Sequence, residues 1–324
     1  MGRDIVLALR ALGLGDVLAA IPALRGLRRS HPDARLLLAC PEGLRPIVMA
    51  AGCVDDIVDV GPDDVAAGDL GAAAGLRGRV GTVVNLHGRG PVSHRWLEGL
   101  DAEVRLGHAA PGWEGPDWRE GLHERERWVR LLAHAGIAAD PDDLRIDPER
   151  LPVENAGERA GATAVVHVGA AHRSRHWPCS RFAEVARDLL GRGFEVVLTG
   201  NGAEVERART VAEAVAAGAG HLGARVRLAA GTQSLSEFAA TIAHAGVLVS
   251  ADTGAAHLAS AFATPSVVIF GPVSPRVWGP PAGPHRVLFD EPRSGGDPFA
   301  DSPDPALLSV TSADVTCALD ALGI

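Results

Sequence analysis

The feature that most constrains the fold is a recurring pattern of short, continuously apolar runs, each followed by a stretch of helical periodicity. Such runs lack the alternation of a half-exposed sheet, so they predict parallel strands that are covered by helices on both faces. In the first half of the chain the runs occupy residues 5–9, 36–40, 56–60 and 82–86. In the second half they occupy residues 164–168, 194–198, 247–250 and 266–270. The pattern therefore predicts a doubly wound α/β fold in each half.

Helices are predicted between these strands, and one Pro- and acid-rich segment interrupts the pattern. The helical stretches are residues 17–30, 48–53, 180–190, 203–217, 255–263 and 312–322. Residues 141–161 have little periodicity and are interpreted as an interdomain linker, whereas the Pro- and Gly-rich residues 271–304 predict a long loop. The expected domains are residues 1–150 and 151–324, with the last helix able to pack back on the first domain.

The charge and the basic residues exclude several classes of function. The 324 residues carry a net charge of -9, which argues against a nucleic-acid partner. All 31 basic residues are Arg, since the printed sequence contains no Lys. Schiff-base catalysis, pyridoxal-phosphate attachment and a phosphate-binding P-loop are thereby excluded. Anionic groups must be bound by Arg, by His or by backbone amides.

The cysteines and the apolar segments indicate a cytoplasmic protein. The cysteines are scattered and lack metal-ligand spacing, so reduced thiols and no bound metal are expected, at positions Cys40, Cys53, Cys179 and Cys317. The N-terminus leads directly into an apolar strand, without the pattern of a signal peptide. No apolar run approaches the about 20 residues of a membrane span. We expect a soluble monomer with at most peripheral membrane association.

The stretch Asp252-Thr253-Gly254-Ala255-Ala256-His257 joins a predicted strand to a predicted helix. The free amides at the start of a helix, together with the helix dipole, form a site for an anion such as a diphosphate. Gly254 permits close approach of a ligand to the backbone, and His257 follows about one turn into the helix. The residues alone are equally consistent with a capped helix start and a core histidine.

The continuation of this stretch resembles the signature of glycosyltransferase family 9, the heptosyltransferase family. The family pattern D-T-G-x-x-H-L-A-x-A-x-x-x-P is matched from Asp252 to Pro265. A strand and Phe270-Gly271-Pro272 follow, where the family has an F-G-P turn.

Other landmarks of the family recur in the same order. Gly15-Asp16 followed by Pro22-Ala23-Leu24 resembles its opening segment, with Gly13 where members commonly have Ser. Asn85-Leu86-His87-Gly88 is similar to the second landmark, and Arg175-His176-Trp177-Pro178 to the third. The resemblance covers most of the chain. It implies a GT-B arrangement, in which two Rossmann-like domains face each other across a cleft.

The same resemblance implies which residues bind the donor. Residues 151–324 would form the nucleotide-sugar-binding domain. The residues expected at the donor diphosphate are Arg175, Asp252, Thr253, Gly254, His257, Gly169 and Ala170. The residues expected at the nucleoside are Gly200, Asn201, Gly202, Glu206, Gln233 and Leu235. Arg175 suits a phosphate because its guanidinium makes bidentate contacts, although the family often has Lys there. A solvated position on a helix is an equal alternative for Glu206.

Residues 1–150 would bind the acceptor and supply a base. A diphosphate leaving group needs stabilisation of negative charge, and the acceptor hydroxyl needs a group that takes its proton. By resemblance Asp16 is the general base of an inverting displacement, and the alternative is a helix N-cap. The residues expected at the acceptor are Gly15, His87, Arg89 and Arg95. Each is alternatively an ordinary surface or turn residue.

The sequence thus predicts an inverting glycosyltransferase that needs no cofactor or metal besides its nucleotide-sugar co-substrate. The resemblance implies an ADP-sugar, with heptose as the transferred sugar. The acceptor is a glycan, a lipid-linked glycan or a secondary metabolite. The alternatives are a nucleotide-sugar epimerase or hydrolase on the same fold, and a non-catalytic protein that binds nucleotide sugars.

Overall fold

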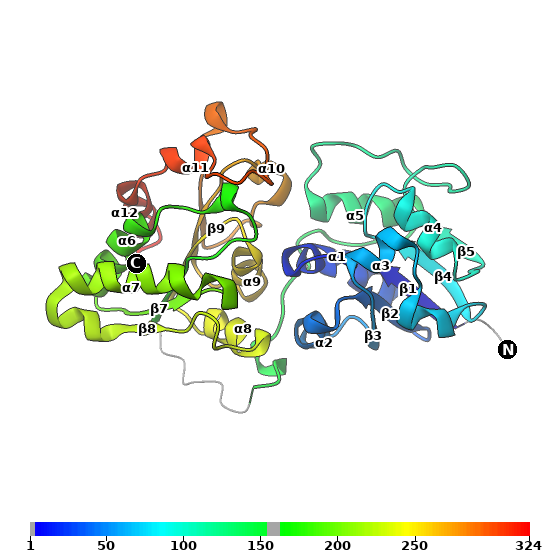
Figure 1. Cartoon of the computed structure of the whole chain (residues 1–324). Coiled ribbons are helices and arrows are strands. Elements are labelled where there is room, and N and C mark those ends of the chain that lie inside the picture. The colour runs from blue at the N-terminus through cyan, green and yellow to red at the C-terminus, as the bar shows by residue number, and fades with distance from the viewer. Residues whose placement is uncertain (1–3, 154–162) are drawn as a thin grey trace. The chain divides into compact units, whose positions relative to one another are not determined.

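The chain forms two compact units, Met1–Arg150 and Leu151–Ile324 (Figure 1). The computed structural model describes residues 4–153 and 163–324. Each unit is an open parallel sheet with its own helices and its own core. The expected pair of doubly wound α/β halves is confirmed by these two sheets.

The first unit contains a five-stranded sheet in the order β3-β2-β1-β4-β5, with every neighbouring pair parallel. Its strands are β1 (Ile5–Leu9), β2 (Arg35–Cys40), β3 (Asp56–Asp59), β4 (Val80–Asn85) and β5 (Val104–Leu106). Its helices are α1 (Leu14–Ser30), α2 (Arg45–Ala51), α3 (Pro62–Ala67), α4 (Val92–Glu98) and α5 (Glu124–His134). Every residue of the central strand β1 is buried, as expected where helices cover both faces.

The second unit contains a six-stranded parallel sheet in the order β11-β10-β9-β6-β7-β8. Its strands are β6 (Thr163–His167), β7 (Glu195–Thr199), β8 (Val226–Leu228), β9 (Val247–Ala251), β10 (Ser266–Ile269) and β11 (His285–Leu288). Its helices are α6 (Cys179–Gly191), α7 (Val205–Ala219), α8 (Leu235–Ala243), α9 (Gly254–Phe262), α10 (Pro275–Trp278), α11 (Pro305–Ser309) and α12 (Ser312–Asp320). Figure 1 shows these helices distributed around the sheet.

The core of the second unit explains the position of the last helix. Trp177 and Phe182 pack edge to face, with ring centroids 4.9 Å apart, and both are buried against the sheet. Val315 and Leu319 of α12 belong to the same buried cluster. The apolar face of α12 is therefore used within the second unit.

Three strands were not predicted from the sequence, and all of them lie at sheet edges. β5 and β8 both read Val-Arg-Leu, so an arginine interrupts the apolar run that marked the central strands. β11 lies in the stretch 271–304, which also contains α10, so the prediction of one long loop there was wrong. Charged side chains are common on edge strands because they oppose pairing with another chain.

The start of α1 and the predicted linker also differ from expectation. Helix α1 begins at Leu14, earlier than the predicted start at Val17, and Gly13 occupies its N-cap position. The first part of the predicted linker 141–161 packs on the first unit, because Leu144 and Ile146 are buried. Asp143 accepts hydrogen bonds there from Arg25 at 2.5 Å and from Arg29 at 2.8 Å. Residues 154–162 of the predicted linker lie outside the described residues.

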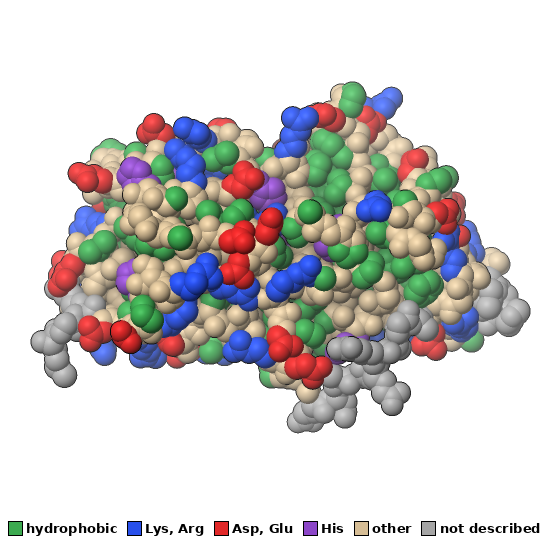
Figure 2. All heavy atoms as spheres, turned by 180° about the vertical axis from the view of Figure 1, so that it is seen from behind, with side chains coloured by type: hydrophobic (Ala, Val, Ile, Leu, Met, Phe, Trp, Pro, Cys, Tyr) green, Lys and Arg blue, Asp and Glu red, His purple; other side chains and the backbone are tan. Residues whose placement is uncertain are grey.

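The surface mixes charges of both signs. Figure 2 shows Arg side chains beside Asp and Glu side chains across the face in view. The ion pairs include that of Arg45 with Asp56, whose Nη1 and Oδ1 atoms lie 2.6 Å apart. Among the described residues, no helix has the length and hydrophobicity required to cross a lipid bilayer.

Candidate functional site

The residues predicted to bind the donor follow three neighbouring strands of the second sheet. β6 lies between β9 and β7, and all three strands are parallel. Gly169 and Ala170 follow β6, Gly200 and Asn201 follow β7, and Asp252 follows β9. Their loops therefore leave the sheet at one edge. The order of the strands reverses at this point, which is where open α/β sheets bind their ligands.

The start of α9 provides the anion-binding feature that the sequence predicted. Thr253 is the N-cap, and its hydroxyl accepts a hydrogen bond from the Ala255 amide at 3.3 Å. The cap takes only one of the amides that a helix start leaves without an intrahelical acceptor. Asp252 is buried just before the cap, and Gly254 is the first helical residue. His257 lies one turn further, edge-on to Trp278 with ring centroids 5.9 Å apart.

Arg175 contacts the residue that precedes this cap. It ends a short 3-10 turn (Arg173–Arg175) that follows β6. Its Nη1 donates to the Asp252 carbonyl oxygen at 3.3 Å and lies 3.7 Å from Asp252 Oδ2. Its buried Nε has no hydrogen-bond partner in the part of the chain that the structure describes. The guanidinium therefore lies beside the start of α9 and retains capacity to donate to an anion.

Glu204 is a buried carboxylate at the same edge, and sequence reasoning did not select it. It is 8 % exposed and accepts a hydrogen bond from the Asn201 amide at 2.6 Å. It also lies against Gly169, where a Cβ atom would collide with its carboxylate. The sequence contained a signal for the position of Glu204, because Asn201 and Glu204 have the spacing of a capping box and form one in the structure.

Glu206, the acid that sequence reasoning selected, lies on the surface. It is exposed and forms an ion pair with Arg209 at 2.6 Å. Its surroundings match the alternative of a solvated helix residue, and Glu204 provides the carboxylate at the strand edge instead. Gly202 begins the 3-10 turn that carries Glu204 (Gly202–Glu204).

The other residues predicted at the nucleoside follow β8. The loop after β8 is held to the edge by Gly231, whose amide donates to the Gly200 carbonyl at 3.0 Å. Gln233 Nε2 donates to Thr241 Oγ1 at 2.6 Å, and Leu235 is the half-buried first residue of α8. The backbone at Gly231 therefore lies beside the loop that follows β7.

In the first unit, Asp16 lies in the first turn of α1 and is not its N-cap. Its carboxylate Oδ1 accepts a hydrogen bond from Arg10 Nη2 at 2.9 Å. Arg10 follows β1, is 1 % exposed, and also donates to Glu124 Oε1 at 2.9 Å. Neither Arg10 nor Glu124 was singled out from the sequence. Asp16 itself remains 31 % exposed in its side chain, so a second group can reach it.

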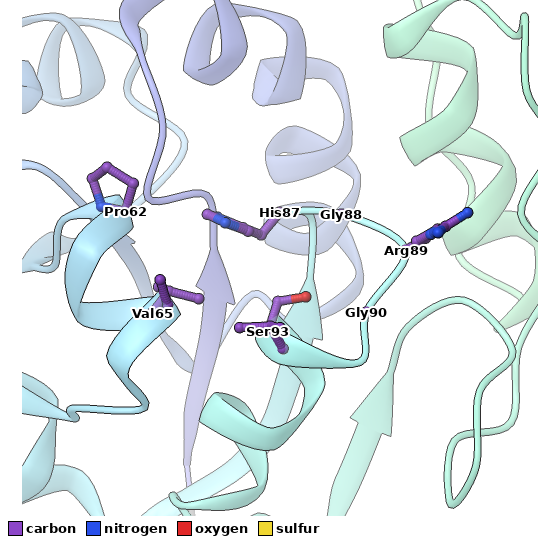
Figure 3. A pocket seen from close by; sticks show the side chains of 9 residues that line it. Pro62, Val65, His87, Gly88, Arg89, Gly90 and Ser93 are labelled. Carbon is purple, nitrogen blue, oxygen red and sulfur yellow. The ribbon is translucent and has the colours of Figure 1, made fainter.

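Two of the residues predicted at the acceptor line one pocket of the first unit, with a cavity volume of about 190 Å³. The loop from His87 to Gly90 forms one wall, and Pro62 and Val65 of α3 form the other (Figure 3). Arg89 lies at the border, and Figure 3 shows its side chain directed away from the loop. Arg95 is exposed on α4 and does not line this pocket, whereas Gly15 lies within the first turn of α1.

His87 is the polar group that the pocket holds in a defined charge state. Burial lowers the pKa of His87 to about 4, and the nearby positive charge of Arg10 contributes to the shift. The ring is therefore neutral at physiological pH. Its buried Nδ1 has no hydrogen-bond partner among residues 4–153 and 163–324. A neutral imidazole that faces the apolar side chains of Pro62 and Val65 suits a hydroxyl group of a ligand.

The described part of the chain contains no candidate metal centre. Within it, no group of three or more His, Cys, Asp or Glu side chains is arranged to bind a metal ion. The cysteines Cys40 and Cys53 are buried thiols without a disulfide partner. Burial raises the pKa of Cys40 to about 12 and that of Cys53 to about 11.

The two parallel sheets, with candidate sites at their carboxyl edges, define a protein of the GT-B fold class. Solved structures share this fold over nearly the whole chain. The heptosyltransferase II of E. coli aligns with a TM-score of 0.77 at 21 % identity, covering 98 % of both chains. A family 9 glycosyltransferase of Veillonella parvula aligns with a TM-score of 0.77 at 20 % identity, covering 99 % of this chain and 98 % of the other.

The sequence comparisons identify the family. The profile of glycosyltransferase family 9 (heptosyltransferase) matches residues 100–293. The chain belongs to this family. The lipopolysaccharide heptosyltransferase 1 of Pseudomonas aeruginosa is 34 % identical over 49 % of this chain and 42 % of its own length. The matched stretch thus spans less than half of that curated relative. The corresponding protein of Salmonella typhimurium is 25 % identical over 85 % of this chain and 90 % of its own.

Proposed function

We propose that this protein transfers a heptose or a similar sugar from a nucleoside diphosphate donor to an acceptor hydroxyl, with inversion at the anomeric carbon. The acceptor oxygen forms a bond to the anomeric carbon while the bond from that carbon to the diphosphate oxygen breaks. The electron pair of the broken bond leaves with the nucleoside diphosphate. The proton of the acceptor hydroxyl passes to the carboxylate of Asp16.

The observation that carries the proposal is the contact of Arg175 with Asp252 at the start of α9, in a member of family 9. In this proposal the Arg175 guanidinium and the first amides of α9 stabilise the charge that develops on the leaving diphosphate. Groups fixed in advance at the place where charge appears lower the barrier most effectively. The backbone at Gly254 offers close approach, and His257 supplies a further donor.

Glu204 is proposed to accept hydrogen bonds from the ribose hydroxyls of the donor. A carboxylate at the end of a strand of this kind of sheet is suited to a ribose diol. Its fixed position supports this role, because the Asn201 amide and the open face of Gly169 together define where the carboxylate lies. Gly200 and Gly202 leave the surrounding backbone accessible.

We propose an ADP-sugar as the donor and a sugar hydroxyl as the acceptor group. Two structures of one relative support the donor: the E. coli heptosyltransferase WaaC was solved with ADP and with ADP-2-deoxy-2-fluoro heptose. For the acceptor, the pocket beside His87 offers a neutral imidazole and the apolar side chain of Val65. A sugar presents the same combination of hydroxyl groups and apolar C–H surface. Arg89 at the border suits a phosphate or carboxylate substituent on that sugar.

The first test is a thermal-shift screen of the full chain against ADP, UDP and GDP and against their sugars, including ADP-heptose. A ligand that binds only the folded protein raises its apparent stability by RT ln(1 + [L]/Kd), so tighter ligands give larger shifts in Tm. We expect ADP and ADP-heptose to raise Tm. A shift with UDP or GDP compounds alone would overturn the choice of ADP-sugar.

The second test replaces the base. Asp16→Asn should reduce sugar transfer by about two orders of magnitude or more, since general base catalysis contributes on this scale. Binding of ADP should be retained, because the substituted residue lies in the other unit. Unchanged transfer would remove Asp16 as the base. Release of free nucleoside diphosphate and free sugar without an acceptor would indicate a hydrolase.

A further inference from the structure

We propose that Arg10 and Glu124 are positioning residues for Asp16 and together set its charge and orientation. This inference rests on the proposed role of Asp16 as the general base. Arg10 follows β1 and Glu124 is the first residue of α5, so the two come from distant parts of the first unit. The proposal gives α5 a role at the carboxyl edge of the first sheet.

Arg10 uses all three guanidinium nitrogens at this edge. Its Nε donates to the Asp16 carbonyl oxygen at 3.1 Å, and its Nη1 donates to the Leu86 carbonyl oxygen at 2.6 Å. Its Nη2 donates to Asp16 Oδ1 and to Glu124 Oε1, each at 2.9 Å. The side chain therefore fixes both the backbone and the carboxylate of Asp16, and it ties them to the end of β4. These contacts fix the orientation of the Asp16 carboxylate.

Glu124 is in turn held on its other oxygen. Arg127 Nε donates to Glu124 Oε2 at 3.0 Å, and Arg127 Nη1 donates to the Arg119 carbonyl oxygen at 2.6 Å. The aromatic rings of Trp128 and Trp118 flank the two guanidinium groups, 4.9 Å from Arg10 and 3.8 Å from Arg127. Each carboxylate oxygen of Glu124 thus has one arginine partner.

Burial shows why the arrangement calls for a functional explanation. Arg10, Glu124 and Arg127 are 1 %, 7 % and 3 % exposed. Removing these charges from water costs free energy, and well-packed apolar residues in their place often make a protein equally stable or more stable. The network instead ends on one partly exposed carboxylate, that of Asp16. The buried charges therefore deliver a fixed, ionised carboxylate to the accessible end of the network.

The two positioning residues act on Asp16 in opposite directions. The positive charge of Arg10 favours the ionised carboxylate, which is the form that accepts a proton. The negative charge of Glu124 partly offsets Arg10 and so preserves the basicity of Asp16. Arg127 and the neutral rings of His87 and His108 also adjoin the network among the described residues.

The test is a pH titration of the Asp16 carboxyl carbon by NMR in the full chain labelled with ¹³C-aspartate, with Asp16→Asn used for assignment. In Arg10→Gln the midpoint should rise by about one pH unit or more, because a neighbouring opposite charge shifts a carboxylate on this scale. In Glu124→Gln it should fall. The exposed pair of Arg209 and Glu206 supplies matched controls. Arg209→Gln and Glu206→Gln should leave the Asp16 midpoint unchanged.

A kinetic readout separates positioning from a purely structural role. Arg10→Gln should lower kcat at neutral pH by about tenfold or more, as expected for impaired base catalysis. Its affinity for ADP should remain that of the wild type. If Arg10→Gln does not fold, Glu124→Gln carries the test through the downward shift of its midpoint.

The outcomes distinguish this inference from the proposed function. Unchanged Asp16 midpoints in the folded variants would overturn the positioning role, even if Asp16→Asn abolishes transfer. Full transfer by Asp16→Asn would instead remove the base, whatever the titration shows.

Discussion

The carboxylate of Glu204 lies against the Cα atom of Gly169, in the space that a side-chain methyl group would need. The two residues follow adjacent strands, β7 and β6, and their contact fixes the carboxylate at the edge of the second sheet. The absence of a side chain at position 169 is therefore a requirement for the position of Glu204.

Gly169→Ala should weaken binding of the nucleoside diphosphate that stabilises the wild type. The added methyl group displaces Glu204, and loss of one charged hydrogen bond costs about 1.5–3 kcal/mol, or at least roughly tenfold in Kd. Isothermal titration calorimetry measures the change. Gly191→Ala in α6 is the matched control, because a Cβ atom at Gly191 meets no atom within 4 Å. Equal affinities for the two variants would contradict the role of Glu204.

Arg175→Gln should lower kcat far more than it lowers affinity for the sugar donor. Removal of one preorganised donor to a developing negative charge typically costs about 10²–10³-fold in kcat. Steady-state kinetics with the donor in excess measure the loss. Arg173→Gln is the control, since Arg173 is exposed in the same 3-10 turn. A similar small effect from both substitutions would argue against charge stabilisation by Arg175.

Thr253→Ala should cost about 1 kcal/mol of stability, the usual value of an N-cap hydroxyl, whereas Thr253→Ser should retain it. Thr253→Ala should also bind the nucleoside diphosphate less tightly, because the start of α9 loses its order. Thr311→Ala removes the corresponding cap of α12, where the Thr311 hydroxyl accepts a hydrogen bond from the Asp314 amide at 3.2 Å. Thermal unfolding with and without nucleotide separates the two effects. A nucleotide shift lost equally in both variants would contradict a local role for Thr253.

Stability should fall as the pH is lowered from about 6.5 to about 4. Burial lowers the pKa values of His87, His108 and His167 to about 4 from the ordinary value of 6.5. The unfolded chain therefore binds protons in this range before the folded chain does, and protonation favours unfolding. Each such histidine contributes at most about 1.4 kcal/mol per pH unit.

Differential scanning calorimetry at pH 7.5, 6 and 5 measures this effect as a decrease in Tm. His108 belongs to the first unit and His167 to the second, so the transitions of both units should respond. The carboxylates of Asp56 and Asp314, whose pKa values are lowered by hydrogen bonds, lose their contribution only at lower pH. A constant Tm between pH 7 and pH 5 would contradict the lowered pKa values of these buried histidines.

The central strands and the edge strand β3 were predictable from the sequence, whereas the edge strands β5, β8 and β11 were not. A strand buried on both faces must be apolar at every position, and β1 and β9 display that property directly. β5 and β8 carry arginine in their middle position, so neither has a continuous apolar run. Their pairing with β4 and β7 is therefore not visible in their local sequence.

The candidate site was predictable where it depends on the chain order alone. Residues 252–257 combine a strand end, a cap and a helix start, and the structure contains each of these features in place. The hydrogen bond between Arg10 and Glu124 joins residues that are 114 positions apart, so no spacing could reveal it. Glu204 and Glu206 are separated by only one residue, and the difference in their burial arises from the turn at Asn201.

The segment that closes the first unit has a consequence for how the protein can be produced. Leu144 and Ile146 are buried, and Asp143 is clamped between two arginines of α1. Each unit has its own sheet and its own hydrophobic core. We therefore expect each unit to fold as a separate fragment, so that each half of the protein can be labelled and mutated by itself.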